Sequence, residues 1–110
     1  MAFRSDLDAL ILGVLRRSDM HGYEISRRIN EGGEGNVQVK EAQLYPLLHR
    51  LENEGMIEAH WLPQEGKPSR KIYRLTEEGK RALEAKRSAW ESFAKSISSI
   101  LDPQKEASHG

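Results

Sequence analysis

The sequence predicts a mostly helical protein with one small β-hairpin, arranged as a winged helix-turn-helix that is followed by a long C-terminal dimerisation helix. Three observations support this fold. Apolar residues recur at helical spacing in four segments, and two short strand-like runs, 57–62 and 72–75, flank a polar turn. The third helical segment ends at Gly55, directly before the first strand-like run. A helix that leads at once into a basic hairpin is the outline of a winged helix.

The chain has 110 residues, of which 37% are hydrophobic and 31% are charged. This length suits one domain, and the low apolar content predicts that a partner chain completes the core. We expect residues 1–76 to form a winged-helix DNA-binding domain and residues 77–102 to form a dimerisation helix packed on the same domain. Residues 103–110 are polar, which predicts a disordered tail.

The first two helices are predicted from capping residues and apolar spacing. Ser5 is a typical N-cap residue with acidic residues in the following turn, and Ser18-Asp19 is a second cap signal before a helix over residues 21–31. Tyr23 is expected to be partly covered. The glycine-rich stretch 32–36 predicts a flexible loop. The apolar positions of these helices are Leu7, Leu10, Ile11, Val14, Leu15, Ile25 and Ile29.

The third helix is predicted over residues 41–54, with an apolar stripe of leucines. Pro46 lacks an amide donor, which predicts a late or distorted helix start. The following run alternates Ile57, Ala59 and Trp61 with polar residues, the pattern of a half-buried strand. The turn is expected to extend from Pro63 to Pro68, and residues 72–75 form the returning strand.

The final helix begins after Thr76, a cap residue followed by two glutamates, and ends before Pro103. Its apolar residues recur every three or four positions, which fits a seven-residue seam between two helices. We therefore expect homodimerisation through this helix. The seam consists of Leu83, Trp90, Phe93, Ile97, Ile100 and Leu101.

A DNA-binding face is predicted on the polar side of the third helix and on the hairpin. Formal net charge is zero, so affinity for double-stranded DNA has to come from a local basic surface. Glutamine and arginine side chains can read base edges, and cations on a hairpin can follow the phosphate backbone. The candidates are Lys40, Gln43, Tyr45, His49 and Arg50 on the helix, and Lys67, Ser69, Arg70 and Lys71 on the hairpin.

These residues resemble the PadR family of bacterial transcription regulators. The matching pieces cover nearly the whole chain and are Leu10-Ile11-Leu12-Gly13, His21-Gly22-Tyr23-Glu24-Ile25, Leu44-Tyr45-Pro46, His49-Arg50-Leu51-Glu52 and Arg70-Lys71-Ile72-Tyr73-Arg74-Leu75-Thr76. Because a single helix follows the hairpin, the chain is similar to the small-tailed subgroup that includes multidrug-responsive repressors.

The resemblance implies a homodimer that represses transcription from an inverted repeat, with Tyr23 and Tyr45 near the DNA backbone. The family usually has small or hydroxyl residues before its Leu-Tyr-Pro motif, whereas this chain has Lys40, Ala42 and Gln43. The helix cap and the base readout can therefore be particular to this protein.

An effector site is also implied by the resemblance. In the small PadR subgroup a tryptophan at the place of Trp90 stacks on planar drugs at the dimer centre, and an aromatic face suits flat apolar or cationic ligands. Arg87 departs from an apolar lining, and would narrow the cavity or favour an anionic aromatic compound. Two other readings stay open: Trp90 is simply part of the packing, or an effector binds elsewhere. The candidate lining is Ala9, Gly13, Leu83, Arg87, Trp90 and Ala94.

Other classes of function find little support in the sequence. The four histidines are scattered and no catalytic or phosphate-loop motif is evident, so we expect no enzyme activity, no cofactor and no metal site. No apolar run approaches the about 20 residues of a membrane span, and no signal-peptide pattern is present, so a cytoplasmic protein without membrane contact is expected. The alternative that stays open is a winged-helix module for protein–protein assembly that does not bind DNA.

Overall fold

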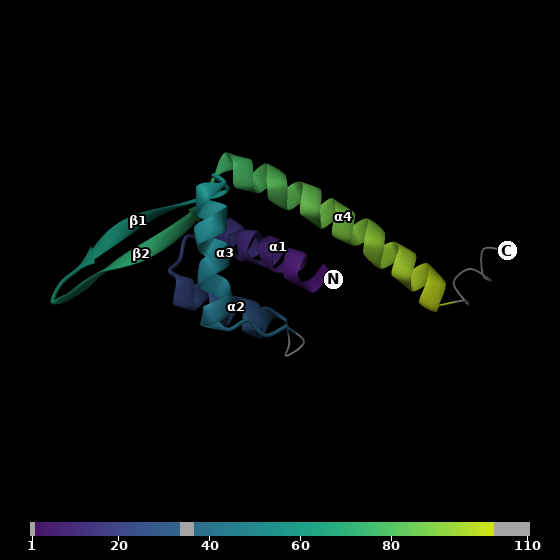
Figure 1. Ribbon diagram of the computed structural model, residues 1–110, viewed down its shortest axis with the longest axis horizontal. Helices are drawn as coiled ribbons and strands as arrows, with labels where there is room; N and C mark the ends of the chain where they lie inside the picture. The colour runs from purple at the N-terminus through teal and green to yellow at the C-terminus, as the bar shows by residue number, and fades with distance from the viewer. Residues whose placement is uncertain (1, 34–36, 103–110) are drawn as a thin grey trace.

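A computed structural model of the protein describes residues 2–33 and 37–102, with side chains from residue 6 onward (Figure 1). The predicted tail, 103–110, lies outside these residues, as does most of the predicted glycine loop. A body of three helices carries a two-stranded antiparallel hairpin and a long last helix, which extend in opposite directions over 66 × 28 × 23 Å. This confirms the predicted fold class. The elements are α1 (Ala2–Arg17), α2 (Gly22–Gly32), α3 (Glu41–Asn53), β1 (Ile57–Gln64), β2 (Lys67–Leu75) and α4 (Glu77–Leu101).

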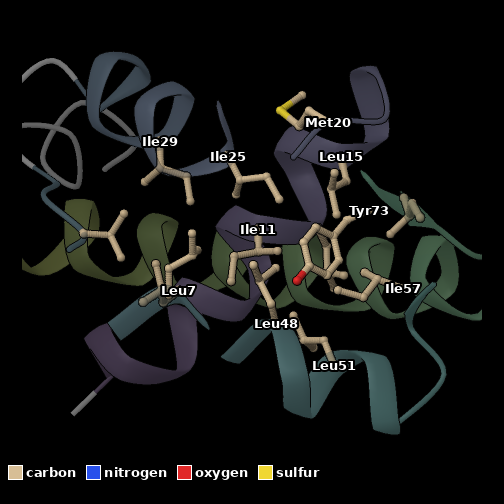
Figure 2. Packing of buried hydrophobic residues seen from close by; sticks show 14 of the residues in the cluster. Leu7, Ile11, Leu15, Met20, Ile25, Ile29, Leu48, Leu51, Ile57 and Tyr73 are labelled. Atoms are coloured by element: carbon tan, nitrogen blue, oxygen red, sulfur yellow. The ribbon is translucent and has the colours of Figure 1, made fainter. Parts of the chain in front are cut away.

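The hydrophobic core surrounds α1, which contacts α2, α3, α4 and β2 (Figure 2). Apolar side chains from every element meet there, and removing this surface from water is the main stabilising contribution to the fold. None of the described helices is long and apolar enough to cross a membrane. The buried cluster comprises Leu7, Ile11, Leu12, Leu15, Met20, Ile25, Ile29, Val39, Leu44, Leu48, Leu51, Ile57, Tyr73, Leu75 and Leu83.

One predicted helix start and one predicted helix cap are wrong, while α2 begins at Gly22, within one residue of its predicted start. Helix α1 begins at Ala2 and not at Ser5, so the acidic residues expected in its first turn lie further inside the helix. Helix α2 is capped by His21, whose Nδ1 accepts the backbone N–H of Glu24 at 3.2 Å. The Ser18-Asp19 signal fails because the chain has to stay extended beyond it. Met20 pairs with Tyr73 through two backbone hydrogen bonds, of 3.2 and 2.9 Å.

Helix α3 runs without interruption from Glu41, so the late or distorted start expected from Pro46 does not occur. A proline at this position removes only the one hydrogen bond that would run to the carbonyl four residues earlier, and the rest of the helix is intact. The side chain of Gln43 caps the N-terminus of α3, because its Oε1 accepts the backbone N–H of Lys40 at 3.1 Å. Gly55 follows α3 with a positive φ of 79°, as the predicted helix end requires.

The hairpin β1–β2, called the wing from here on, has a shorter turn than predicted. Gln64 pairs with Lys67, which leaves only residues 65 and 66 to turn the chain, and Gly66 has a φ of 70°. Pro63 lies at an irregularity in β1, and Pro68 lies within β2. Both prolines fit because each strand of a two-stranded hairpin is an edge strand, where a missing N–H is tolerated.

The last helix lies on the body along its first turns only. Thr76 caps it, since its hydroxyl accepts the backbone N–H of Gly79 at 3.0 Å. Gly79 and Leu83 are buried against the body, whereas every residue from Arg87 to Leu101 is exposed. Figure 1 shows this outer part of α4 extending beyond the other helices. Leu83 is therefore part of the protomer's own core, which corrects its prediction as a residue of the dimer seam.

Candidate nucleic-acid interface

A hollow of about 530 Å³ lies where the start of α2, helix α3 and strand β2 meet. Four residues predicted to bind DNA line it together, although they come from three separate segments of the chain. We call this site the wing hollow. It is lined by His21, Gly22, Tyr23, Tyr45, Arg70, Lys71 and Tyr73.

The position of Tyr45 depends on Gly22. A Cβ on Gly22 would lie 2.7 Å from the Tyr45 ring and hydroxyl, so only glycine lets the ring rest on the start of α2. Burial raises the pKa of the Tyr45 hydroxyl, and the charges of Glu41 and Tyr73 add to the shift. The hydroxyl therefore keeps its proton at neutral pH and can donate a hydrogen bond to an anion.

Tyr23 and His21 also line the wing hollow. Their rings are stacked, with centroids 6.1 Å apart and planes at 13°. Tyr23 is 57% exposed, so the partial cover predicted for it is wrong; it projects from the first turn of α2, beyond the core. His21 was not predicted as a DNA-binding residue, because in the sequence it is one of four scattered histidines. Only the fold places it beside the other residues of the hollow.

The cations of the wing are divided between its two faces. Lys71 shares a face with Tyr73 and lies opposite Trp61 on β1, whereas Arg70 and Arg74 alternate onto the other face. Lys71 Nζ lies 5.3 Å from the Tyr73 ring centroid and 6.0 Å from that of Trp61. It is also 3.4 Å from Oε1 of Glu52 on α3. Lys71 is thus held in place by the protein, while Arg70 and Arg74 are exposed.

Arg50 is ion-paired with two acidic side chains of the protein. Its Nη2 binds Oδ2 of Asp8 on α1, and its Nε lies 3.8 Å from Glu54. Asp8 is buried, and its Oδ1 has no partner among the described residues, so the carboxylate depends on this one contact. Arg50 therefore joins α3 to α1 through this ion pair, while about half of its side chain stays exposed, and its predicted contact with DNA stays a prediction. Lys40, Gln43 and His49 are exposed along α3, as are Lys67 and Ser69 near the tip of the wing.

Comparison with known proteins decides the family. Residues 11–85 match the Transcriptional regulator PadR-like family. The chain belongs to this family. It is 37% identical to the negative transcriptional regulator PadR of Bacillus subtilis over 66% of this chain and 40% of that protein. The PadR-like family consists of transcriptional regulators, which agrees with the expectation that the chain is not an enzyme.

Solved structures of PadR-like proteins share the fold. A transcriptional regulator from Clostridium thermocellum superposes with a TM-score of 0.83 and 33% identity, over 92% of this chain and 95% of that one. Bacillus subtilis PadR in complex with operator DNA superposes with a TM-score of 0.67 and 35% identity. That match covers 72% of this chain and 44% of PadR, so the chain spans less than half of that relative's length.

The residues predicted to bind an effector in this PadR-like chain are only partly brought together. Ala9 and Gly13 line a second hollow, of about 550 Å³, between α1 and the end of α2. Trp90 is 48% exposed on the outer part of α4, with its ring 5.6 Å from that of Phe93. Arg87 is paired with Glu84 and Glu91, at 3.2 Å each, so its charge is balanced on its own helix. Ala94 is exposed.

Proposed function

We propose that this protein is a homodimeric transcriptional repressor that binds an inverted-repeat operator through α3 and the wing. The wing hollow carries the proposal. It gathers two exposed tyrosines, Tyr23 and Tyr45, and two cations, Arg70 and Lys71, from three segments around the start of α2 and the wing. Hydroxyl donors and cations are the groups that hold phosphate oxygens. The complex of Bacillus subtilis PadR with operator DNA supports this assignment by family.

Helix α3 carries the proposed base readout. Lys40, Gln43 and His49 are exposed on it and can reach into the major groove while the wing lies along the backbone. Gln43 also caps α3 through its Oε1, so one end of its amide is oriented by the protein. Replacing Gln43 by alanine should therefore change the preferred operator, measured by selection from random duplexes, more than the affinity for arbitrary DNA.

The wing is tested by Arg70→Ala. We expect weaker binding to every duplex sequence, and a plot of log affinity against log salt concentration whose slope is smaller by about one. The reason is that Arg70 is exposed beside the hollow and releases about one counterion when it meets a phosphate. Fluorescence anisotropy with labelled duplexes over a series of salt concentrations measures both quantities.

The matched control for Arg70→Ala is Arg81→Ala, which removes the same charge from an exposed position on α4. Equal effects of the two variants would mean that only net charge matters, and the wing would not be the contact. A second function, protein–protein assembly without DNA, is favoured by the formal net charge of zero. Wild-type protein that fails to bind duplex DNA at low salt would support that function instead.

The proposed regulation is release from DNA by a planar aromatic effector that stacks on Trp90 between two protomers. Trp90 is exposed on an isolated stretch of helix, and small residues, Ala9 and Gly13, leave space along α1. A flat ring would gain stacking energy, and it would relieve repression if it favoured a dimer whose two α3 helices no longer match successive major grooves. Ala94 and the ion-paired Arg87 flank Trp90 on the same helix.

Titration of planar dyes and phenolic acids into a Trp61→Phe background tests this regulation, because Trp90 is then the only tryptophan. We expect quenching of its fluorescence and an affinity loss of about 5–150-fold in Trp90→Ala, which corresponds to about 1–3 kcal/mol. Unchanged affinity in Trp90→Ala would remove this residue from the site. Loss of dimerisation in that variant would show that the indole belongs to the packing.

A further inference from the structure

The most exposed aromatic side chain of the described residues lies on the wing. Trp61 is 64% exposed and belongs to the face of the wing that looks toward the body. Along this face the core residues Ile57 and Tyr73 are followed outward by the cross-strand pair of Lys71 and Trp61. Trp61 therefore lies on the same face as the core residues and the wing hollow, toward the tip of the wing.

Trp61 is coupled to the wing hollow through Lys71. The two residues are directly opposite each other in the hairpin, and the ammonium lies 6.0 Å from the indole centroid. The same ammonium lies 5.3 Å from the ring of Tyr73, so one cation is placed between two rings. Its contact with Glu52 connects this arrangement to α3. Such contacts give the indole a preferred orientation although the body does not cover it.

We propose that Trp61 is a DNA contact, which packs its indole on the sugar–phosphate backbone beside the phosphates held at the wing hollow. This inference rests on the proposed DNA-binding function and adds an apolar contact to it. Deoxyribose presents an apolar surface between charged phosphates, and an indole flanked by a cation matches both. Because sugars occur at every step of the duplex, the contact adds affinity without sequence preference.

The same strand offers a matched control. Leu62, the neighbour of Trp61, is also apolar and is 47% exposed, but it lies on the opposite face of the wing. Truncation of either residue removes exposed apolar surface from β1. Trp61→Ala removes apolar surface from the face that carries Lys71 and Tyr73. Leu62→Ala removes apolar surface from the other face, which carries Arg70.

Affinity for a duplex would be measured over a range of salt concentrations for the full chain and for Trp61→Ala, Trp61→Phe and Leu62→Ala. We expect about a fivefold or greater loss for Trp61→Ala, partial retention for Trp61→Phe and a smaller loss for Leu62→Ala, which lies opposite Arg70 on the other face. The salt slope of Trp61→Ala should equal that of wild type, because no phosphate charge loses its partner. A thermal unfolding curve of Trp61→Ala shows whether the wing still folds. If the wing of Trp61→Ala does not fold, the affinity of Trp61→Phe for the duplex tests the contact instead.

Fluorescence gives an independent measurement. The full chain emits from Trp61 and Trp90 alone, and Trp61→Phe is the reference that keeps only Trp90. The emission of the full chain should be quenched when a duplex is added, and that of Trp61→Phe should change much less. The inference is overturned if the full chain binds DNA with the same change in emission as Trp61→Phe, or if Trp61→Ala binds as tightly as the full chain. It is also overturned if Leu62→Ala loses as much affinity as Trp61→Ala. A full chain that binds no duplex at low salt contradicts the proposed function itself, which separates the two failures.

Discussion

Replacing Gly79 by alanine is expected to lower the free energy of unfolding by about 3 kcal/mol or more. A Cβ at this position would lie 2.1 Å from the backbone carbonyl oxygen of Met56 and 2.6 Å from the Leu75 side chain. A backbone oxygen cannot rotate away, so α4 would have to leave the body at its first turn. That turn is also where the Thr76 hydroxyl caps α4 and accepts the N–H of Gly79. Urea unfolding should show a fall in the midpoint of about 1–3 M.

The control for Gly79→Ala is Gly32→Ala. Gly32 is also helical, but a Cβ there meets nothing within 4 Å. Alanine at this position should be neutral or stabilise by up to about 1 kcal/mol, because it restricts the unfolded chain. Both variants have to be compared at one protein concentration, since a dimer gains stability as concentration rises. Equal stability of the two variants would show that α4 does not approach the body as closely as described.

Introducing aspartate at both Ile97 and Ile100 is expected to convert the proposed dimer into a monomer and to lower operator affinity on the order of 100-fold. The exposed apolar residues of α4, which we call the outer seam, are Trp90, Phe93, Ile97, Ile100 and Leu101. They repeat at three- and four-residue spacing on the outer part of α4, where every described residue is exposed. Two charges buried there without partners would oppose association strongly. Sedimentation at micromolar concentration and operator binding measure the two effects.

A second double variant, Ser92→Asp with Ser99→Asp, places the same two charges on the other side of α4. These serines are exposed and lie on the same helix, so the two double variants carry the same net charge. The serine variant should remain dimeric. If the variant with Ile97→Asp and Ile100→Asp is still a dimer, the outer seam is not the interface. The fold of the protomer should survive in both variants, because Ile97 and Ile100 make no part of its core.

Local patterns in the sequence were sufficient for the elements of this fold. Apolar residues at helical spacing predicted all four helices, and the cap at Thr76 and the end at Gly55 are as expected. These signals succeed because capping and helix periodicity involve residues within about four positions of each other. The same short-range character explains the failure at Ser18-Asp19. There, pairing of Met20 with Tyr73, far along the chain, kept the backbone extended.

The candidate site could be predicted in its residue types but not in its arrangement. The sequence by itself determined the family motifs, the basic hairpin and the apolar repeat of the last helix. Only the tertiary structure placed Tyr45 on Gly22, paired Arg50 with Asp8 and left Trp61 exposed at the outer end of a core-facing strand. The physical reason is that periodicity defines the face on which a side chain lies, whereas its neighbours depend on the packing of elements distant in sequence.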